Sequence, residues 1–511
     1  MNRLNIVLIC PPPLEIIEPW VDAPPYARNS LAFIAGYLRK HLDCNIKIIE
    51  AKFERLSFEE TVKRTLAFNP DIVGLTAYTQ EIKPAAYTAG LIKKSNPNIV
   101  TVIGGVHITA IPEQTMKEFP SFDIGVIGEG EITFAELCRA LANKKELKVV
   151  NGLIYRREEI LITTGFRERI ADQDSLPMPS WDLMPVAPIY FMHTERGCPF
   201  NCTFCMNHNG RVVRKRSVDL VIEEMEYIVN TFGPSQINFG DELFSVDMQR
   251  TAELMDAIVE RGLHKRVTWD AQTHVKYVNY ELLKKMRAAN VYQLDMGVET
   301  GDPERLKEMG KGTYKELIIK AFAEAKRAGV QTGGLFILGH PNETIKSIKN
   351  TIKLAIKINP TLPMFGTMTP FPGTLVAKMA ASRESGYSGL SMDWDDYKMR
   401  LGSGLAYKNF TKQQLNMLML EAYIKIYLYN FRFLDFAKFA WNYRKGALQL
   451  VKKVLKREDV LSQRINKPFD YDSIINSDYK ITNADMIESR DYFWAIQQNE
   501  NSRLRKLFKA V

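Results

Sequence analysis

Three of the six cysteines in this chain lie within eight residues, in the run Cys198-Pro-Phe-Asn-Cys202-Thr-Phe-Cys205. Thiolates at this C-x3-C-x2-C spacing can surround one metal centre. A structural zinc site needs four ligands, and the candidate for a fourth is His208. Iron–sulfur clusters are normally held by four cysteines. Three cysteines therefore predict a cluster with one iron open to another ligand, which is a catalytic arrangement. A zinc site completed by His208, or three buried structural cysteines, are the alternatives.

The remaining cysteines, Cys10, Cys44 and Cys138, have no spacing typical of a metal site. Six cysteines in 511 residues are too few for a disulfide scaffold, so we expect ordinary core or surface thiols. The composition, 46% hydrophobic and 25% charged, is that of a globular protein. No run of about 18 uncharged apolar residues occurs. The apolar start meets Pro11 without a signal peptide's long apolar region, which predicts a cytoplasmic protein.

The three clustered cysteines follow the first strand of a region in which strands and helices alternate. Strands are expected at 189–194, 236–239, 267–271, 292–297, 331–338 and 362–368, and helices near 217–231, 247–262, 279–289, 313–329 and 342–358. Six strands with five crossover helices predict a partial (β/α)6 barrel within residues 188–400. The C-terminal ends of barrel strands carry the chemistry.

Strands and helices also alternate over residues 1–145, ahead of a proline-rich linker at 146–187 that begins with a hairpin-like piece. Strands are expected at 5–9, 46–50, 72–76, 99–103 and 123–127, and helices near 29–41, 58–68, 84–95, 112–118 and 131–143. This alternation predicts a doubly wound, Rossmann-like parallel sheet that binds a ligand beyond its strand C-termini. A nicotinamide-binding domain is rejected, because Pro11-Pro12-Pro13-Leu14 stands where its Gly-x-Gly-x-x-Gly motif belongs.

The cysteine run, with Phe204 before its last member, resembles the cluster motif of the radical S-adenosylmethionine (SAM) enzymes. In that family three cysteines hold a 4Fe–4S cluster whose open iron chelates SAM. An electron from an external one-electron reductant then cleaves SAM to methionine and a 5′-deoxyadenosyl radical. The resemblance covers about residues 189–375, and the further segments that carry it are Gly240-Asp241-Glu242, Gly297-Val298-Glu299-Thr300-Gly301, Gly333 to Gly339 with Pro341 and Glu343, and Pro370 to Thr374.

The resemblance implies a role for each of these segments in binding SAM. Gly240, Asp241 and Glu242 would receive the SAM amino group, Glu299 would contact the ribose, and the segment containing Gly334 would support the adenine. Each has a plainer alternative. Asp241 and Glu242 can cap the following helix, Glu299 can be a solvated loop acid, and glycine-rich strand ends are often turns. The order of these segments on successive strand ends favours the functional interpretation.

The N-terminal region resembles the cobalamin-binding domain that precedes the barrel in one large radical SAM subgroup. The segments are Val73-Gly74-Leu75-Thr76, Gly104-Gly105-Val106-His107 and Gly128-Glu129-Gly130-Glu131. The resemblance implies that cobalamin contacts Thr76, Tyr78, Gly104, Gly105, Gly128, Glu129 and Gly130. The Asp-x-His-x-x-Gly motif, whose histidine ligates cobalt in many cobalamin proteins, does not occur. His107 is therefore not assigned as a cobalt ligand, and Tyr78 is the residue that could approach the lower face of the corrin.

The resemblance reaches both the class B radical SAM methyltransferases and the magnesium-protoporphyrin ester cyclases. The pairing of cobalamin with SAM implies methylation of an unactivated carbon by way of a 5′-deoxyadenosyl radical and methylcobalamin. One alternative is oxidative ring formation on a tetrapyrrole. A methylthiotransferase is more distant, because Cys10, Cys44 and Cys138 do not reproduce that family's second cluster motif. An iron–sulfur carrier explains neither the open iron nor the SAM-type segments. The sequence identifies no further catalytic residue.

The C-terminal region, residues 401–511, reads as helical and holds most of the chain's net charge of +9. Residues 425–470 contain eleven Lys or Arg and four Asp or Glu, a local net charge of +7. Basic residues interleaved with aromatic ones over 413–457 favour peripheral contact with a membrane and a lipophilic small-molecule substrate. The alternative is a helix that packs its aromatic residues on the barrel. No RNA-binding module is recognisable, so nucleic acid is not an expected partner.

Overall fold

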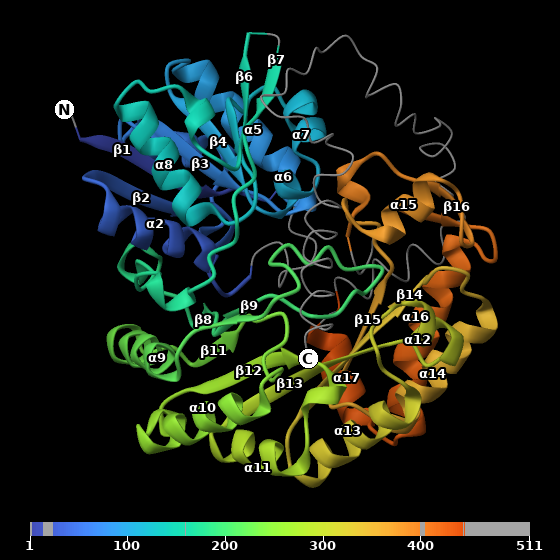
Figure 1. Cartoon of the computed structure of the whole chain (residues 1–511). Helices are drawn as coiled ribbons and strands as arrows, with labels where there is room; N and C mark the ends of the chain where they lie inside the picture. Colours follow the sequence, from blue (N-terminus) through green and yellow to red (C-terminus); the bar gives the residue numbers. More distant parts are fainter. Residues whose placement is uncertain (1–2, 14–23, 159, 399–403, 443, 445–511) are drawn as a thin grey trace, which may run out of the picture.

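The computed structural model describes residues 3–13, 24–158, 160–398, 404–442 and 444, and Figure 1 shows their arrangement in two α/β parts. The first sheet has the strand order β2-β1-β3-β4-β5-β6-β7. Its strands are β1 (Leu4–Cys10), β2 (Cys44–Glu50), β3 (Ile72–Thr76), β4 (Val100–Gly104), β5 (Ile124–Val126), β6 (Leu153–Arg157) and β7 (Ile160–Thr163). Strands β1 to β5 run parallel, which confirms the predicted doubly wound sheet.

Helices cover both faces of this sheet because alternate side chains of its strands enter two separate cores. Ile6 and Leu8 of β1 pack in the core that contains α2 and α8, whereas Val7 and Ile9 pack in the core that contains α5. The helices are α2 (Asn29–His41), α3 (Ala51–Glu54), α4 (Phe58–Leu66), α5 (Ile82–Ser95), α6 (Val106–Ala110), α7 (Pro112–Glu118) and α8 (Gly130–Ala142).

The hairpin-like piece expected at the start of residues 146–187 is the pair β6 and β7. Strand β6 pairs antiparallel with β5, and β7 pairs antiparallel with β6, so this piece extends the first sheet. The chain then crosses to the second part, and the buried ring of Trp181 packs on Tyr190 of its first strand. The outer limits of the predicted domains stay predictions.

The second part is a six-stranded parallel sheet with the order β15-β14-β13-β12-β11-β8, as predicted for a partial barrel. The strands are β8 (Ile189–Met192), β11 (Gln236–Phe239), β12 (Thr268–Thr273), β13 (Val291–Glu299), β14 (Thr332–Leu338) and β15 (Leu362–Thr367). The helices are α9 (Val218–Phe232), α10 (Met248–Glu260), α11 (Tyr280–Ala288), α12 (Pro303–Glu308), α13 (Lys315–Arg327) and α14 (Ile345–Ile358).

One face of the barrel sheet packs on its helices, and the other face is polar and partly exposed. On β13 the apolar side chains of Leu294 and Met296 are buried, while Gln293 and Asp295, which alternate with them, are half-buried. Asp270 of β12 lies on the same half-buried face and accepts a hydrogen bond from Gln236 Nε2 at 2.8 Å. This alternation leaves the inner face of the sheet accessible to a ligand.

The described part of the C-terminal region is mainly helical, as predicted, and begins with one short strand. After α15 (Leu375–Ala381), strands β16 (Tyr387–Leu390) and β17 (Leu405–Tyr407) form an antiparallel pair, because Tyr387 and Leu405 bury their side chains in a small core. Helices α16 (Lys412–Tyr429) and α17 (Phe433–Asn442) follow. Most of the basic segment at 425–470 lies outside the described residues. Within the described chain, no helix is long and apolar enough to span a membrane.

Candidate active site

The cysteines lie in a loop whose two ends are held together by a short antiparallel ladder. Strands β9 (Glu195–Arg196) and β10 (Arg214–Lys215) pair at the base of this loop, which we call the cysteine loop (residues 197–213). Gly197 opens it with a φ of +106°, and a side chain there would collide with the carbonyl oxygen of Val212. Cys198 N donates to Gly210 O at 2.9 Å, and Asn207 Nδ2 donates to Cys198 O at 2.7 Å. Hydrogen bonds within the loop therefore help to set its conformation.

The three thiols of the cysteine loop are free, with Cys198 and Cys202 half-buried and Cys205 exposed. Burial raises the pKa of Cys198 to about 11 and that of Cys202 to about 12. Across the described residues, no three His, Cys, Asp or Glu side chains lie close enough to hold a single metal ion. In a 4Fe–4S cluster each cysteine binds a different iron, so its ligands do not have to converge on one ion as those of a zinc site do.

The two acids after β11 hold the cysteine loop and its approach. Asp241 is buried and accepts hydrogen bonds from Thr194 N at 2.7 Å, Thr194 Oγ1 at 2.7 Å and Glu195 N at 3.1 Å. Glu242 accepts from Gly197 N at 3.2 Å and also from Asn209 Nδ2. The helix-capping alternative is wrong, because Asp247 caps α10.

Gly240, before these acids, lies where a side chain would come within 2.9 Å of the Phe191 ring and 3.0 Å of the His193 ring. The three predicted residues after β11 thus pack directly against the end of β8 and the cysteine loop. A role for them toward SAM stays a prediction.

Glu299 ends β13 in a buried position, so the alternative of a solvated loop acid is wrong. Its carboxylate forms an ion pair with Lys311, whose Nζ also donates to Gly297 O at 3.0 Å. The Glu299 backbone has a φ of +64°, at a shift in the register between β13 and β14. The charges of Lys311 and Glu299 both act on Cys202, which places this pair beside the cysteine loop. Lys311 was not predicted from the sequence, because nothing in its spacing connects it to Glu299.

Gly334 and its neighbour Gly333 face opposite sides of the barrel sheet. A side chain at Gly334 would come within 2.9 Å of Pro360, toward the outside of the barrel, whereas one at Gly333 would collide with Asp295 on the inner face. The missing side chain of Gly333 therefore makes room for the Asp295 carboxylate on the inner face of the sheet. On that face, Gly334 can support a ligand only through its backbone. The prediction for Gly334 stays a prediction about its backbone.

A cavity of about 200 Å³ lies beside the cysteine loop. Thr203, Arg305 and His340 line it. Thr203 Oγ1 and Arg305 Nε are buried without a hydrogen-bond partner. Burial lowers the pKa of His340 to about 4, so its ring is neutral at pH 7. Buried polar atoms without partners indicate a polar ligand or water. Arg305 and His340 were not predicted from the sequence.

Small residues lie at the strand ends of the first sheet, from the buried Thr76 to the exposed Gly128. Gly105 has a φ of +100°, and a side chain there would come within 2.8 Å of Ala77 O. Gly128 has a φ of +84°, and no atom lies within 4 Å of the place that a side-chain methyl group would take. Tyr78 is half-exposed, and the guanidinium carbon of Arg28 lies 4.3 Å from its ring centroid. Together with Thr76, Gly104 and Gly130 at neighbouring strand ends, this surface fits a large flat ligand such as a corrin.

His107 is buried and packs its ring edge-to-face on Trp394, with ring centroids 5.0 Å apart. Its Nδ1 lies 3.2 Å from Thr79 Oγ1, and burial lowers its pKa to about 3. The ring is thus enclosed by protein on several sides. This packing agrees with leaving His107 unassigned as a cobalt ligand.

The side chain of Glu129 does not face open space, although its motif placed it among the cobalamin-binding residues. Its carboxylate accepts hydrogen bonds from Ile170 N at 2.7 Å, Arg214 Nη1 at 2.8 Å and Arg196 Nη1 at 3.2 Å. Arg196 also pairs with Glu131 at 2.6 Å. Only the backbone of Glu129 remains free to contact a cofactor.

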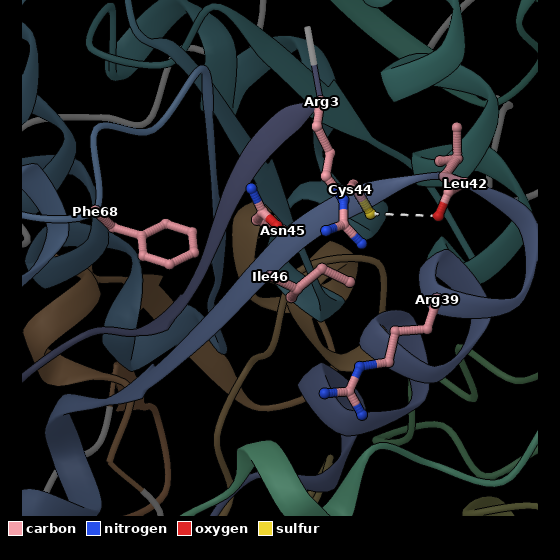
Figure 2. Close-up of a pocket in the computed structure, with 7 residues that line it drawn as sticks. All are labelled: Arg3, Arg39, Leu42, Cys44, Asn45, Ile46 and Phe68. Atoms are coloured by element: carbon pink, nitrogen blue, oxygen red, sulfur yellow. Dashed lines mark hydrogen bonds between the residues drawn. The ribbon is translucent and has the colours of Figure 1, made fainter.

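A second cavity, of about 390 Å³, lies away from these elements and is shown in Figure 2. It is lined by Arg3, Arg39, Leu42, Cys44, Asn45, Ile46 and Phe68. These residues surround the N-terminal ends of β1 and β2, the end of a parallel sheet opposite to the one that binds ligands. Cys44 donates to Leu42 O at 3.8 Å there, so its thiol takes part in local packing rather than in the active site.

Comparisons with known proteins agree with this division into two cofactor sites. The family models that match are the Radical SAM superfamily over residues 192–355 and the B12 binding domain over residues 25–138. An uncharacterised methyltransferase of Pyrococcus horikoshii is 35% identical over 84% of this chain and 93% of its own length. The anaerobic magnesium-protoporphyrin IX monomethyl ester cyclase of Rubrivivax gelatinosus is 29% identical over 67% of this chain and 64% of its own. The cobalamin-dependent SAM radical enzyme OxsB, solved with aqua-cobalamin and SAM bound, has a TM-score of 0.68 at 20% identity, over 83% of this chain and 67% of its own.

Proposed function

Because the chain belongs to the radical SAM enzymes that carry an N-terminal B12-binding domain, we propose that it methylates an unactivated carbon of a small-molecule substrate. Its cofactors are a 4Fe–4S cluster, SAM and cobalamin. When bound, they supply a 5′-deoxyadenosyl radical and a transferable methyl group. The protein's own contribution is to place them and to exclude water.

The observation that carries the proposal is the direct contact between the two cofactor regions. Arg196 lies two residues before Cys198 and forms ion pairs with Glu129 at 3.2 Å and Glu131 at 2.6 Å. Gly128 and Gly130, which flank Glu129, belong to the predicted cobalamin surface. A radical formed at the cysteine loop and a methyl group held at the first sheet would therefore meet in one site, as methylation of an inert carbon requires.

Oxidative cyclisation is the second candidate, because a cyclase is among the relatives that match two thirds of this chain. A methylthiotransferase is less well supported. Cys10, Cys44 and Cys138, which would have to hold its second cluster, are buried in the apolar core of the first part. The proposed metal ligands remain Cys198, Cys202 and Cys205.

The proposal is tested by following the methyl group of SAM. The full-length protein is reconstituted anaerobically with iron, sulfide and hydroxocobalamin, reduced with titanium(III) citrate and supplied with SAM that carries a trideuterated methyl group. We expect S-adenosylhomocysteine to form and deuterium to enter the corrinoid fraction, both only when cobalamin is present. Formation of 5′-deoxyadenosine with no label in the corrinoid would instead favour the cyclase.

We further propose that helix α17 contacts a membrane surface and that the substrate is lipophilic. Phe436 and Phe439 on one face of α17 pack against Tyr423 and Tyr427 of α16. The other face of α17 exposes three large apolar side chains, those of Phe433, Leu434 and Trp441, by 57%, 80% and 70% of their surface. Phe431, in the turn before the helix, is exposed by 82%. Lys438 lies on the same helix. Exposed apolar groups beside a cation suit an anionic lipid surface.

Co-sedimentation with vesicles tests this contact. Vesicles of phosphatidylcholine with phosphatidylglycerol should bind the protein more strongly than vesicles of phosphatidylcholine alone. The changes Leu434→Ser and Trp441→Ser should weaken the binding, and the control Val149→Ser, at an exposed residue of the first part, should not. Equal binding by all variants would contradict the contact.

A further inference from the structure

Four buried charges lie at the junction between the two parts of the protein. Glu129 precedes α8 and Glu131 lies in its first turn, whereas Arg196 belongs to β9 and Arg214 to β10. The distances are 3.2 Å from Arg196 Nη1 to Glu129, 2.6 Å from Arg196 Nη2 to Glu131 and 2.8 Å from Arg214 Nη1 to Glu129. Their side chains expose no more than 11% of their surface. We call this group the junction quartet.

The quartet is balanced in charge and closed to solvent. Burial disfavours the charged form of Glu129, but the neighbouring charges of Arg196 and Arg214 outweigh it and hold the pKa of Glu129 below its usual range. Both acids lie at the N-terminal end of α8, where the helix dipole also favours negative charge. Each arginine is therefore held at a fixed point on the first part.

The two arginines hold the cysteine loop at both of its ends. Arg196 and Arg214 are opposite partners in the ladder between β9 and β10, one before the loop and one after it. Glu129 contacts both, so one carboxylate closes the base of the loop. Arg214 Nη2 also donates to Asn209 O at 2.9 Å, inside the loop. A shift of residues 128–131 would therefore move the cysteines as well.

We propose that the junction quartet sets the position of the cysteine loop relative to the cobalamin surface, which makes Arg196 and Arg214 positioning residues of the reaction. This inference rests on the proposed function for its catalytic consequence. Its structural basis is independent, because the contacts are made between side chains of the protein itself. The competing explanation is that the quartet only holds the two parts together. In that case its charges would not be needed, since buried ion pairs can often be replaced by apolar side chains without loss of stability.

The test uses two variants that remove a negative charge. Glu129→Gln weakens the contacts of both arginines, and Glu131→Gln weakens a contact of Arg196 alone. The matched control is Glu224→Gln. Glu224 is fully buried, pairs with Arg216 at 2.5 Å and accepts a hydrogen bond from Trp181 Nε1 at 3.0 Å, so it is engaged as fully as Glu129 but by other partners. Glu131→Gln is the milder change and keeps the test usable if Glu129→Gln folds poorly.

Hydrogen–deuterium exchange of the full chain before reconstitution is the first readout. We expect Glu129→Gln to accelerate exchange of residues 197–213 and 128–131 together, by about tenfold or more, and Glu131→Gln to do so more weakly. Glu224→Gln should leave both segments as in the wild type. Unchanged exchange in both junction variants would overturn the inference.

The second readout is the ratio of two products in the reconstituted protein. Methyl transfer to cobalamin, measured as S-adenosylhomocysteine, should fall about tenfold or more in Glu129→Gln while cleavage to 5′-deoxyadenosine falls much less, because misplacement affects the step that joins the two sites. An equal fall in both products would mean that the quartet only holds the two parts together and would overturn the inference. If the wild type formed no S-adenosylhomocysteine, the proposed function would fail, and the exchange experiment would still decide whether the quartet positions the loop.

Discussion

The buried ion pair between Lys311 and Glu299 allows a prediction of stability. Their side chains expose 10% and 8% of their surface, and Lys311 Nζ also donates to Gly297 O at 3.0 Å. The change Lys311→Met keeps the length of the side chain and removes its charge, which leaves the Glu299 carboxylate buried without a cation. Breaking one side of a buried pair costs about 3 kcal/mol or more. The left-handed backbone of Glu299 adds to this, because such a conformation persists only when its surroundings hold it.

The double variant Glu299→Gln/Lys311→Met should lose less stability than the two single changes added together. Both charges then leave the core at once, so no unpaired ion remains, and we expect a coupling energy of about 2 kcal/mol. Urea unfolding, followed by circular dichroism and tryptophan fluorescence, measures each free energy of unfolding. Coincidence of the two signals is required, because a protein of two parts can unfold in steps.

The matched control for this cycle is Lys285→Met. Lys285 pairs with Asp256 across two helices, but these side chains expose 43% and 52% of their surface. An exposed pair contributes about 1 kcal/mol or less. If Lys311→Met cost no more than Lys285→Met, or if the coupling energy were zero, the view of Glu299 and Lys311 as a buried support of the active site would be refuted.

Three other changes test separate parts of the structure. Asp241→Ala leaves two backbone N–H groups and the Thr194 hydroxyl without their acceptor. The free energy of unfolding should fall by about 2 kcal/mol or more, and iron retention after reconstitution should fall with it. Wild-type values of stability and of iron retention would contradict this prediction. Gly197→Ala places a methyl group against Val212 O and should reduce iron retention, whereas Gly233→Ala, at a positive-φ glycine with open space around it, should not. Burial lowers the pKa of His107 to about 3 from an ordinary value of 6.5. Between pH 6.5 and pH 3 the unfolded chain therefore binds a proton that the folded protein does not, and the free energy of unfolding falls as the pH drops through this range. His107→Phe should make this fall smaller in urea unfolding compared at pH about 7 and about 5, and an unchanged slope would contradict it.

The fold was largely predictable because apolar β-branched runs mark buried parallel strands. Residues 72–76 were expected as a strand and form β3, in which every residue is buried. The antiparallel pair β16 and β17 was not expected, because its stability comes from contacts such as Tyr387 with Tyr407 that only the folded chain brings together. The extension of the first sheet by β6 and β7 likewise depends on the free edge of β5.

The candidate site was predictable only where local spacing carries the chemistry. The cysteines satisfy this condition, because the three ligands lie in one loop. Lys311, Arg196 and Arg214 do not, since their acidic partners are reached through tertiary structure, over 85 residues in the case of Arg214 and Glu129. Glu129 shows the reverse case, in which a residue selected by motif proves to have its side chain engaged by two arginines.

The central claim is that Cys198, Cys202 and Cys205 hold a cluster at which SAM is cleaved reductively. The most direct measurement is 5′-deoxyadenosine formation by the anaerobically reconstituted and reduced full-length protein, compared with Cys202→Ser. The wild type should form 5′-deoxyadenosine and show iron and sulfide in the amounts of one 4Fe–4S cluster. Cys202→Ser should form none, while Cys138→Ser, at a thiol buried in the first part, should behave as the wild type. Retained 5′-deoxyadenosine formation in Cys202→Ser would contradict the account.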